Sequence, residues 1–266
     1  MNRIAFVDHD IDNFHANTFA RLLSEHDTGF RLSAVYANRR DNIAAWADER
    51  KVSTVEKIAD LAPLADYVMV LAPSNPEMHL DLCRETFALG KTTYVDKTFA
   101  PDYVTAQKIF ALADLHGVAI QSSSVLRYTE LQVHCASQPD LPPRFINSWA
   151  SGGNFNEYII HPLESVVSVM GPKIEAITAE ENAGCTRITL RFSGDRIATI
   201  QMHVAHATPF YHVVSDAKAT KAISIDGSRI FLNGLLATLD FFKAGKAQIP
   251  REETLAIMLA LDTLRK

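Results

Sequence analysis

The sequence predicts an α/β protein with a parallel sheet in its N-terminal part and a C-terminal α+β part built on a mostly antiparallel sheet. Short apolar runs alternate with segments of helical periodicity up to residue 121, which is typical of βαβ units. After about residue 124, apolar runs follow one another across polar turns, as the strands of antiparallel sheets do. We therefore expect two domains, at residues 1–123 and 124–266.

The expected strands of the first domain are short and apolar, like strands buried in parallel sheets. They cover residues 3–7, 31–36, 67–72, 92–95 and 118–121. Helices are expected around residues 16–23 and at 41–50, 54–61, 76–89 and 101–116, with Asp41 as a cap of the second and glycines ending the last two. This alternation predicts a Rossmann-type sheet whose functional loops meet at the carboxyl ends of the strands.

The second domain has a different pattern, in which strands dominate the middle and helices flank them. Strands are expected at residues 145–150, 174–180, 186–192, 196–204, 211–215 and 220–225. Helices are expected at residues 156–170, 230–244 and 251–265. A flat antiparallel sheet of this kind offers a surface for self-association, so we expect a homodimer or a homotetramer.

Composition excludes several function classes. The 266 residues are 47% hydrophobic, enough for a substantial core, and the net charge of −5 argues against a nucleic-acid partner. No apolar run has the 18 or more residues of a membrane span, and the N-terminus does not resemble a signal peptide, so we expect a cytoplasmic protein. The three cysteines match no metal spacing, and we predict no metal site.

The loop after the first strand departs from the usual dinucleotide-binding pattern. Where G-x-G-x-x-G is expected, the chain has Asp8-His9-Asp10-Ile11-Asp12-Asn13. Two unit charges about 5 Å apart repel each other by roughly 3 kcal/mol at an effective dielectric constant near 20. Either no dinucleotide binds here, or it binds with the acids turned away. A third interpretation is that the acids favour the positive end of the following helix.

Several segments together resemble the Gfo/Idh/MocA family of sugar and polyol oxidoreductases. Leu71-Ala72-Pro73-Ser74-Asn75-Pro76-Glu77-Met78-His79 is similar to the family's A-T-P-N-x-x-H stretch. The segment Gly90 to Ala100, with Asp96-Lys97-Thr98, is similar to G-K-H-V-x-x-E-K-P-x-A. Gly152-Gly153-Asn154 followed by His161-Pro162-Leu163-Glu164 is similar to the glycine run and D-x-G-x-H-x-x-D. The resemblance implies a Rossmann fold and NAD(P)-dependent redox chemistry.

Four residues are candidates for catalysis: Lys97, His161, Glu157 and Glu164. The resemblance places Lys97 beside the nicotinamide and the reacting carbinol, where a lysine can hold a substrate oxygen. A histidine side chain ordinarily titrates near neutral pH, so His161 is a candidate to exchange the carbinol proton. Glu157 lies four residues before it, on the same face if the segment is one helix, and Glu164 is positioned to orient the ring. The alternatives are a surface lysine and a histidine that caps a helix.

The remaining candidates concern the substrate and the cofactor. Arg127 and Tyr128 follow the fifth strand and are predicted to bind a polar or anionic substrate, although a domain-linking salt bridge is an equally good interpretation. The absence of an acid in Asn38-Arg39-Arg40, after the second strand, favours NADP over NAD. If a dinucleotide binds, we expect it to contact Asp8, Asp10, Asn13, Asn38, Arg39, Pro73, Asn75 and His79.

These features lead to one hypothesis and two alternatives. The hypothesis is an oxidoreductase that transfers a hydride between NADP(H) or NAD(H) and a carbinol of a sugar, polyol or sugar acid. The first alternative is a cofactor-free isomerase, epimerase or lyase on the same fold, which the acidic loop supports. The second is a non-catalytic family member that binds a small molecule.

Overall fold

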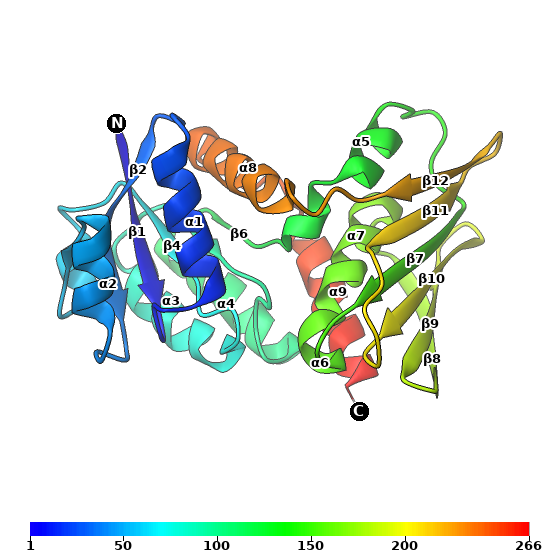
Figure 1. The fold of residues 1–266 in the computed structure, drawn as a ribbon, viewed down its shortest axis with the longest axis horizontal. Helices are drawn as coiled ribbons and strands as arrows, with labels where there is room; N and C mark the ends of the chain where they lie inside the picture. The colour runs from blue at the N-terminus through cyan, green and yellow to red at the C-terminus, as the bar shows by residue number, and fades with distance from the viewer. Residues whose placement is uncertain (266) are drawn as a thin grey trace. The chain divides into compact units, whose positions relative to one another are not determined.

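The computed structural model describes residues 1–265 and divides into two compact units. The first unit comprises residues 1–123 and 235–251 (Figure 1). The second comprises residues 124–234 and the residues from Glu252 onward. The segment 235–251, which the sequence analysis assigned to the second domain, thus packs with the first unit.

The first unit contains a parallel six-stranded sheet, which confirms the Rossmann-type prediction. Its strand order is β3-β2-β1-β4-β5-β6, with all pairs parallel. Order 3-2-1-4-5-6 is that of dinucleotide-binding sheets, which bind ligands beyond the carboxyl ends of the strands. The strands are β1 (Asn2–Asp8), β2 (Phe30–Ala37), β3 (Ser53–Thr54), β4 (Tyr67–Val70), β5 (Thr93–Val95) and β6 (Ile120–Gln121).

Helices alternate with these strands, and their bounds differ in places from the expected ones. The helices are α1 (Phe14–Glu25), α2 (Ile43–Arg50), α3 (His79–Phe87) and α4 (Tyr103–His116), and there are 3₁₀ turns η1 (Ile58–Leu61) and η2 (Pro76–Met78). The helix expected at 54–61 is only η1, and the one expected at 76–89 begins as η2 because Pro76 sets a tight first turn. Asp41 is not the cap of α2, since Asn42 precedes the helix and makes no side-chain cap bond.

The core of the first unit explains why the segment 235–251 packs with it. The middle of β1, from Ile4 to Val7, is completely buried. Helix α8 (Ile230–Ala244) brings Phe242 against Tyr67 of β4, with ring centroids 4.8 Å apart and nearly parallel planes. Beyond the helix, the side-chain oxygen Oε1 of Gln121 accepts the amides of Gln248 and Ile249, at 2.7 and 3.2 Å. Aromatic burial and these bonds stabilise the segment against the sheet.

The second unit is built on a mostly antiparallel six-stranded sheet, as predicted. Its order is β12-β11-β7-β10-β9-β8, and only β7 and β10 pair in parallel. The strands are β7 (Phe145–Ser151), β8 (Ile174–Asn182), β9 (Cys185–Phe192), β10 (Arg196–His203), β11 (Tyr211–Ser215) and β12 (Thr220–Ser224). Buried and less buried residues alternate along β7, β10 and β11, so one face of the sheet is covered and the other is not.

The covered face packs against helix α7, which contacts β7 and β10 (Figure 1). The helices of this unit are α5 (Glu130–Ala136), α6 (Phe155–Tyr158), α7 (Ile160–Met170) and α9 (Arg251–Leu264), with a 3₁₀ turn η3 (Val125–Arg127). The sequence pattern predicts one helix at 156–170, whereas the structure has α6 and α7 as separate helices. Helix α5 was not predicted. Within residues 1–265, no helix is long and apolar enough to cross a membrane.

Candidate functional site

The loop that joins β1 to α1 is closed by hydrogen bonds among its own groups. The carboxylate of Asp8 is 1% exposed, and its Oδ1 accepts the amides of His9 and Asp10 at 2.7 and 3.2 Å. Its Oδ2 accepts the side-chain amide of Asn13 at 2.8 Å. Burial raises the pKa of Asp8 to about 7, although these hydrogen bonds oppose the shift.

Asn13 also caps the first turn of α1. Its Oδ1 accepts the amides of His15 and Ala16, both at 3.0 Å, and its Nδ2 donates to the carbonyl of Asp10 at 2.7 Å. These amides begin the helix after the first strand, where a Rossmann fold binds a pyrophosphate. Because the loop's own side chains occupy these donors, the loop as it stands does not fit the diphosphate of a dinucleotide.

The end of β5 carries a buried group of charged side chains. The Nδ1 of His15 lies 2.6 Å from Oδ2 of Asp96, and both residues are buried. Burial by itself raises the pKa of Asp96, but attraction to His15 and Lys97 outweighs it and leaves that pKa below its usual value. The Nζ of Lys97 donates to the carbonyl of Pro73 at 3.3 Å. The structure thus brings two predicted site residues together, Lys97 and Pro73, and adds His15 and Asp96.

His79, predicted to contact a cofactor, is completely buried and links the ends of two strands. Its Nδ1 lies 3.0 Å from the carbonyl oxygen of Phe99, and its Nε2 lies 2.7 Å from that of Leu71. Burial lowers the pKa of His79, although the two carbonyl contacts oppose the shift. This burial argues against a direct contact with a cofactor and favours a role in holding the strand ends.

The residues at the end of β2 are engaged with the loop after β1. Asn38 donates its amide to the carbonyl of Asp8, at 3.1 Å. Arg39 forms ion pairs with Asp10 at 3.1 Å and with Asp41 at 3.8 Å. Its guanidinium therefore pairs with one acid of the loop and one acid of its own segment. Asn75, the other predicted cofactor contact, donates from Nδ2 to Glu77 at 3.0 Å.

In the second unit, His161 has a defined partner for one ring nitrogen. The Oγ of Ser124 lies 2.7 Å from Nδ1 of His161 and also accepts the amide of Leu126 at 3.2 Å. The rings of Tyr158 and Phe210 approach the imidazole edge-on, with centroids 5.8 and 6.5 Å away. A hydroxyl can both donate and accept, so Ser124 can bond Nδ1 in either protonation state of the ring.

Arg127 is held by two carboxylates of its own unit. Its Nε donates to Glu164, and its Nη1 donates to Glu253 at 2.6 Å. Arg127 and Glu164 are buried, and the two carboxylates raise the pKa of Arg127 although burial opposes this. Arg127 thus forms a salt bridge within its own unit and not the domain-linking one considered from the sequence, and the partner of Glu164 is Arg127.

The other two candidates of the second unit are Glu157, which lies in α6, and Tyr128, which follows η3. The carboxylate of Glu157 accepts from Nδ2 of Asn154 at 3.0 Å, so Glu157 belongs to the start of α6. It does not share a helix with His161, because α6 and α7 are separate helices. Tyr128 follows η3, and its carbonyl accepts Nδ2 of Asn233 at 3.1 Å.

Sequence reasoning missed Ser124, Asp96 and His15 as site residues. Asp96 and Ser124 follow buried strands of the parallel sheet, at the edge where such sheets bind ligands. Their positions in the sequence therefore indicated a possible site. No local sequence pattern indicates the pairing of His15 with Asp96, because 81 residues separate them in the chain.

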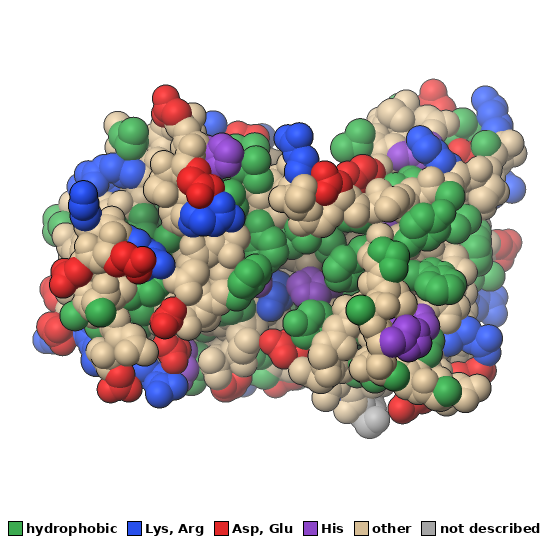
Figure 2. Space-filling model, viewed as in Figure 1, with side chains coloured by type: hydrophobic (Ala, Val, Ile, Leu, Met, Phe, Trp, Pro, Cys, Tyr) green, Lys and Arg blue, Asp and Glu red, His purple; other side chains and the backbone are tan. Residues whose placement is uncertain are grey.

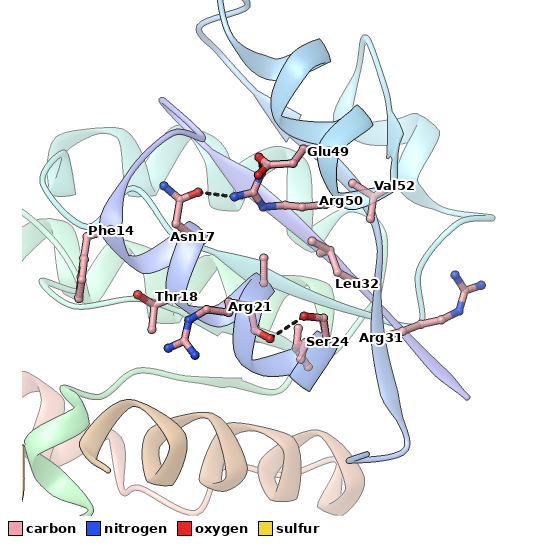
Figure 3. A pocket seen from close by; sticks show the side chains of 12 residues that line it. Phe14, Asn17, Thr18, Arg21, Ser24, Arg31, Leu32, Glu49, Arg50 and Val52 are labelled. Atoms are coloured by element: carbon pink, nitrogen blue, oxygen red, sulfur yellow. Dashed lines mark hydrogen bonds and ion pairs between the residues drawn. The ribbon is translucent and has the colours of Figure 1, made fainter. Parts of the chain in front are cut away.

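The first unit also has a groove of about 720 Å³ away from the candidate residues (Figure 3). It lies between α1, β2 and α2, and Arg50 crosses it to donate from Nη2 to Oδ1 of Asn17 at 3.0 Å. Arg50 also stacks on Trp46, and Arg21 pairs with Glu25. None of the site residues that were predicted from the sequence lines this groove.

Comparison with known proteins identifies the N-terminal unit. Residues 12–124 match the family model described as "Oxidoreductase family, NAD-binding Rossmann fold". No curated protein sequence matches the chain.

Solved structures resemble almost the whole chain. A probable dehydrogenase from Thermotoga maritima has a TM-score of 0.84 at 13% identity, covering 98% of this chain and 94% of its own. A scyllo-inositol dehydrogenase from Lactobacillus casei, solved with NAD(H) and scyllo-inositol, has a TM-score of 0.83 at 14% identity, covering 99% and 96%. A myo-inositol 2-dehydrogenase from Lactobacillus plantarum has a TM-score of 0.81 at 14% identity, covering 99% and 96%. At such identities, the likeness concerns the fold.

Proposed function

Since residues 12–124 belong to the Gfo/Idh/MocA family of NAD-binding Rossmann-fold oxidoreductases, we propose that this chain interconverts a carbinol and a carbonyl on a sugar, polyol or sugar acid. Inositol dehydrogenases among the structural relatives support this substrate class. The family implies NADP or NAD as the hydride partner, and the run Asn38-Arg39-Arg40 favours NADP. Because the loop after β1 does not fit the diphosphate, the proposal rests on what the chain's own residues do to the substrate.

The observation that carries the proposal is the bond between His161 and Ser124. An alcohol that becomes a ketone must lose its hydroxyl proton, and a histidine is suited to take it near neutral pH. Ser124 holds Nδ1 at 2.7 Å and so orients the ring. His161 is the proposed acid–base residue, and Ser124 is a positioning residue.

Lys97 is the proposed partner of the substrate oxygen. Its ammonium group is buried beside Asp96, whose carboxylate also binds His15. An ammonium group in such surroundings stabilises the negative charge that develops on an alcohol oxygen. Tyr128 is retained as a proposed substrate contact, and Pro73, Asn75, Asn38 and Arg39 as proposed cofactor contacts. Glu157 is a proposed helper of His161, whereas Arg127 and Glu164 are assigned to the internal ion pair.

The test is a dehydrogenase assay of the purified chain against a panel of sugars, polyols and sugar acids, with NADP⁺ and NAD⁺ at millimolar levels. Absorbance of the reduced nicotinamide reports turnover. His161→Ala should lower turnover by about 10²–10⁴-fold, which is the usual contribution of a general acid–base group. His26→Ala, at an exposed position, is the matched control and should leave the rate unchanged. Unchanged turnover in His161→Ala would remove His161 from the mechanism.

The closed loop after β1 favours a second candidate function. A chain that gains little from a dinucleotide still has a histidine, a buried lysine and carboxylates, the groups that isomerases, epimerases and lyases use for proton abstraction. This alternative predicts incorporation of deuterium from heavy water into a sugar substrate without added cofactor. Saturable sugar binding with neither turnover nor exchange would instead indicate a non-catalytic binding protein.

We propose a homodimer or homotetramer that forms through the uncovered face of the second sheet. Trp149 of β7 and Ile197 of β10 are 42% and 38% exposed. Figure 2 shows hydrophobic side chains gathered over these strands. Exposed apolar surface of this kind marks interaction sites. Light scattering after gel filtration should give an oligomer, and Trp149→Arg should shift it towards the monomer. A wild-type monomer would contradict the proposal.

A further inference from the structure

We infer that this chain has replaced the diphosphate cradle of its Rossmann fold with hydrogen bonds among its own side chains, so that the loop after β1 does not bind a nicotinamide dinucleotide. This inference rests on the proposed function, which supplies the class of cofactor, a nicotinamide dinucleotide. Any dinucleotide that serves the proposed reaction must then be held by other strand ends and bind weakly.

The first argument is the spacing of the residues that form the bonds. In G-x-G-x-x-G, the glycines stand at the first, third and sixth positions, and their roles are a tight turn, close approach to the pyrophosphate and close helix packing. Asp8, Asp10 and Asn13 have this spacing. Each position that the motif keeps free of side chains therefore carries a polar side chain here.

The second argument is that these three residues bind one another. Oδ2 of Asp8 accepts Nδ2 of Asn13 at 2.8 Å, and the same Nδ2 donates to the carbonyl of Asp10 at 2.7 Å. Oδ1 of Asp8 accepts the amide of Asp10 at 3.2 Å. A carboxyl group that accepts main-chain amides beside a helix N-terminus occupies donors that a bound anion would otherwise use.

The third argument concerns the amides themselves. The donors of His9 and Asp10 point to the carboxylate of Asp8, and those of His15 and Ala16 point to Oδ1 of Asn13. A diphosphate in this position would have to displace both acceptors. An incoming ligand that breaks existing bonds to form equivalent ones gains little net affinity.

The fourth argument is electrostatic. Asp10 is 38% exposed at its side chain and stands at the position that the pyrophosphate approaches most closely. Arg39 pairs with Asp10 at 3.1 Å and is therefore already engaged by this carboxylate. Repulsion between one carboxylate and one phosphate charge about 5 Å apart corresponds to roughly 100-fold in affinity at an effective dielectric constant of 20.

The experiment is a titration with NADPH and NADH, followed by nicotinamide fluorescence and by calorimetry. We expect half-saturation of the wild-type chain only at millimolar concentrations or above. The variant that combines Asp8→Gly, Asp10→Gly and Asn13→Gly restores the glycine spacing, and its affinity should rise by about 100-fold. The matched control is Asp12→Gly, which removes a negative charge and adds a glycine at a position outside the motif. It should leave affinity nearly unchanged.

Two results would overturn the inference: low-micromolar binding by the wild-type chain, or an unchanged affinity in the folded triple variant. A second measurement does not depend on the variant's stability. Hydrogen exchange of the wild-type amides at His9, Asp10, His15 and Ala16 should be the same with and without millimolar NADPH, and new protection of these amides would contradict the closed loop. Since binding and not turnover is measured, an inactive enzyme that binds weakly still supports this inference, while tight binding without activity overturns it.

Discussion

The strongest stability prediction concerns Arg127 of the second unit. The side chains of Arg127, Glu164 and Glu253 are 9%, 6% and 14% exposed. Substitution Arg127→Met keeps most of the side-chain volume but leaves two carboxylates in a low-dielectric environment without a cation. Breaking a buried pair in this way costs about 3–5 kcal/mol. That is a large share of the roughly 5–15 kcal/mol by which domains are stable.

The size of this loss should depend on pH. Burial raises the pKa of Glu164, and Arg127 opposes the shift. Without Arg127, the native state holds a proton on this carboxyl more tightly than the unfolded chain does. Stability of the variant is therefore recovered as pH falls through the raised native pKa. The deficit of Arg127→Met should be largest at pH 8 and smaller at pH 5.

Urea unfolding followed by circular dichroism, at both pH values, measures these differences. Adding Glu164→Gln and Glu253→Gln to Arg127→Met should restore much of the lost stability, because no unpaired charge remains. Arg187→Met is the control, since it breaks an ion pair whose side chains are 57% and 71% exposed and should cost less than about 1 kcal/mol. A loss as small as this in Arg127→Met at pH 8 would refute the reasoning and reopen the substrate-binding role of Arg127.

Three further predictions concern the candidate site. Gly152→Ala should destabilise the chain by about 1–3 kcal/mol, because the new Cβ would lie 2.0 Å from an atom of the Tyr158 ring. Gly153→Ala is the control in thermal melts, because a Cβ at Gly153 would meet no atom within 4 Å. Equal losses of stability in the two variants would contradict the clash. Because folding raises the pKa of Asp8 to about 7, the native state retains its proton and stability falls as pH rises from 4 to 7. The unfolding free energy of wild type relative to Asp8→Asn should therefore drop by roughly 3 kcal/mol between pH 5 and 8, and a flat difference would argue against the shift. Ser124→Ala should lower turnover and shift the pH–rate profile. Ser124→Thr keeps the hydroxyl and should have the turnover and the profile of the wild type. A wild-type profile in Ser124→Ala would show that Ser124 does not position His161.

Much of the fold could be read from local patterns. The apolar runs around Ile4 and Val68 predicted buried parallel strands, since a strand buried on both faces must be apolar throughout. The apolar runs separated by polar turns predicted β7 and β10 as strands of a mostly antiparallel sheet, which the structure confirms. The separation of α6 from α7 and the short helix α5 were missed, because such brief segments have too few turns for a clear helical period.

The candidate site was only partly predictable, and Arg127 and His79 show why. Both residues stand after or near strand ends, where the sequence alone allows either a ligand contact or a structural bond. Glu253, the second partner of Arg127, lies 126 residues away along the chain, and no local pattern identifies it. Burial and partner identity, which separate the two interpretations, are properties of the packed chain.

The sequence by itself determined the class of fold, the position of Lys97 and His161 in family motifs, and the absence of glycine from the loop after β1. These features can be read from short stretches of sequence, because they do not depend on how the chain packs. Only the tertiary structure decided where the acids of that loop point: Asp8 turns inward to accept amides, and Asp10 turns to Arg39. The direction of a short carboxylate depends on which donors lie within about 3 Å: the amides of His9 and Asp10 reach Asp8 only when the loop is folded, and Arg39 comes from the end of the neighbouring strand.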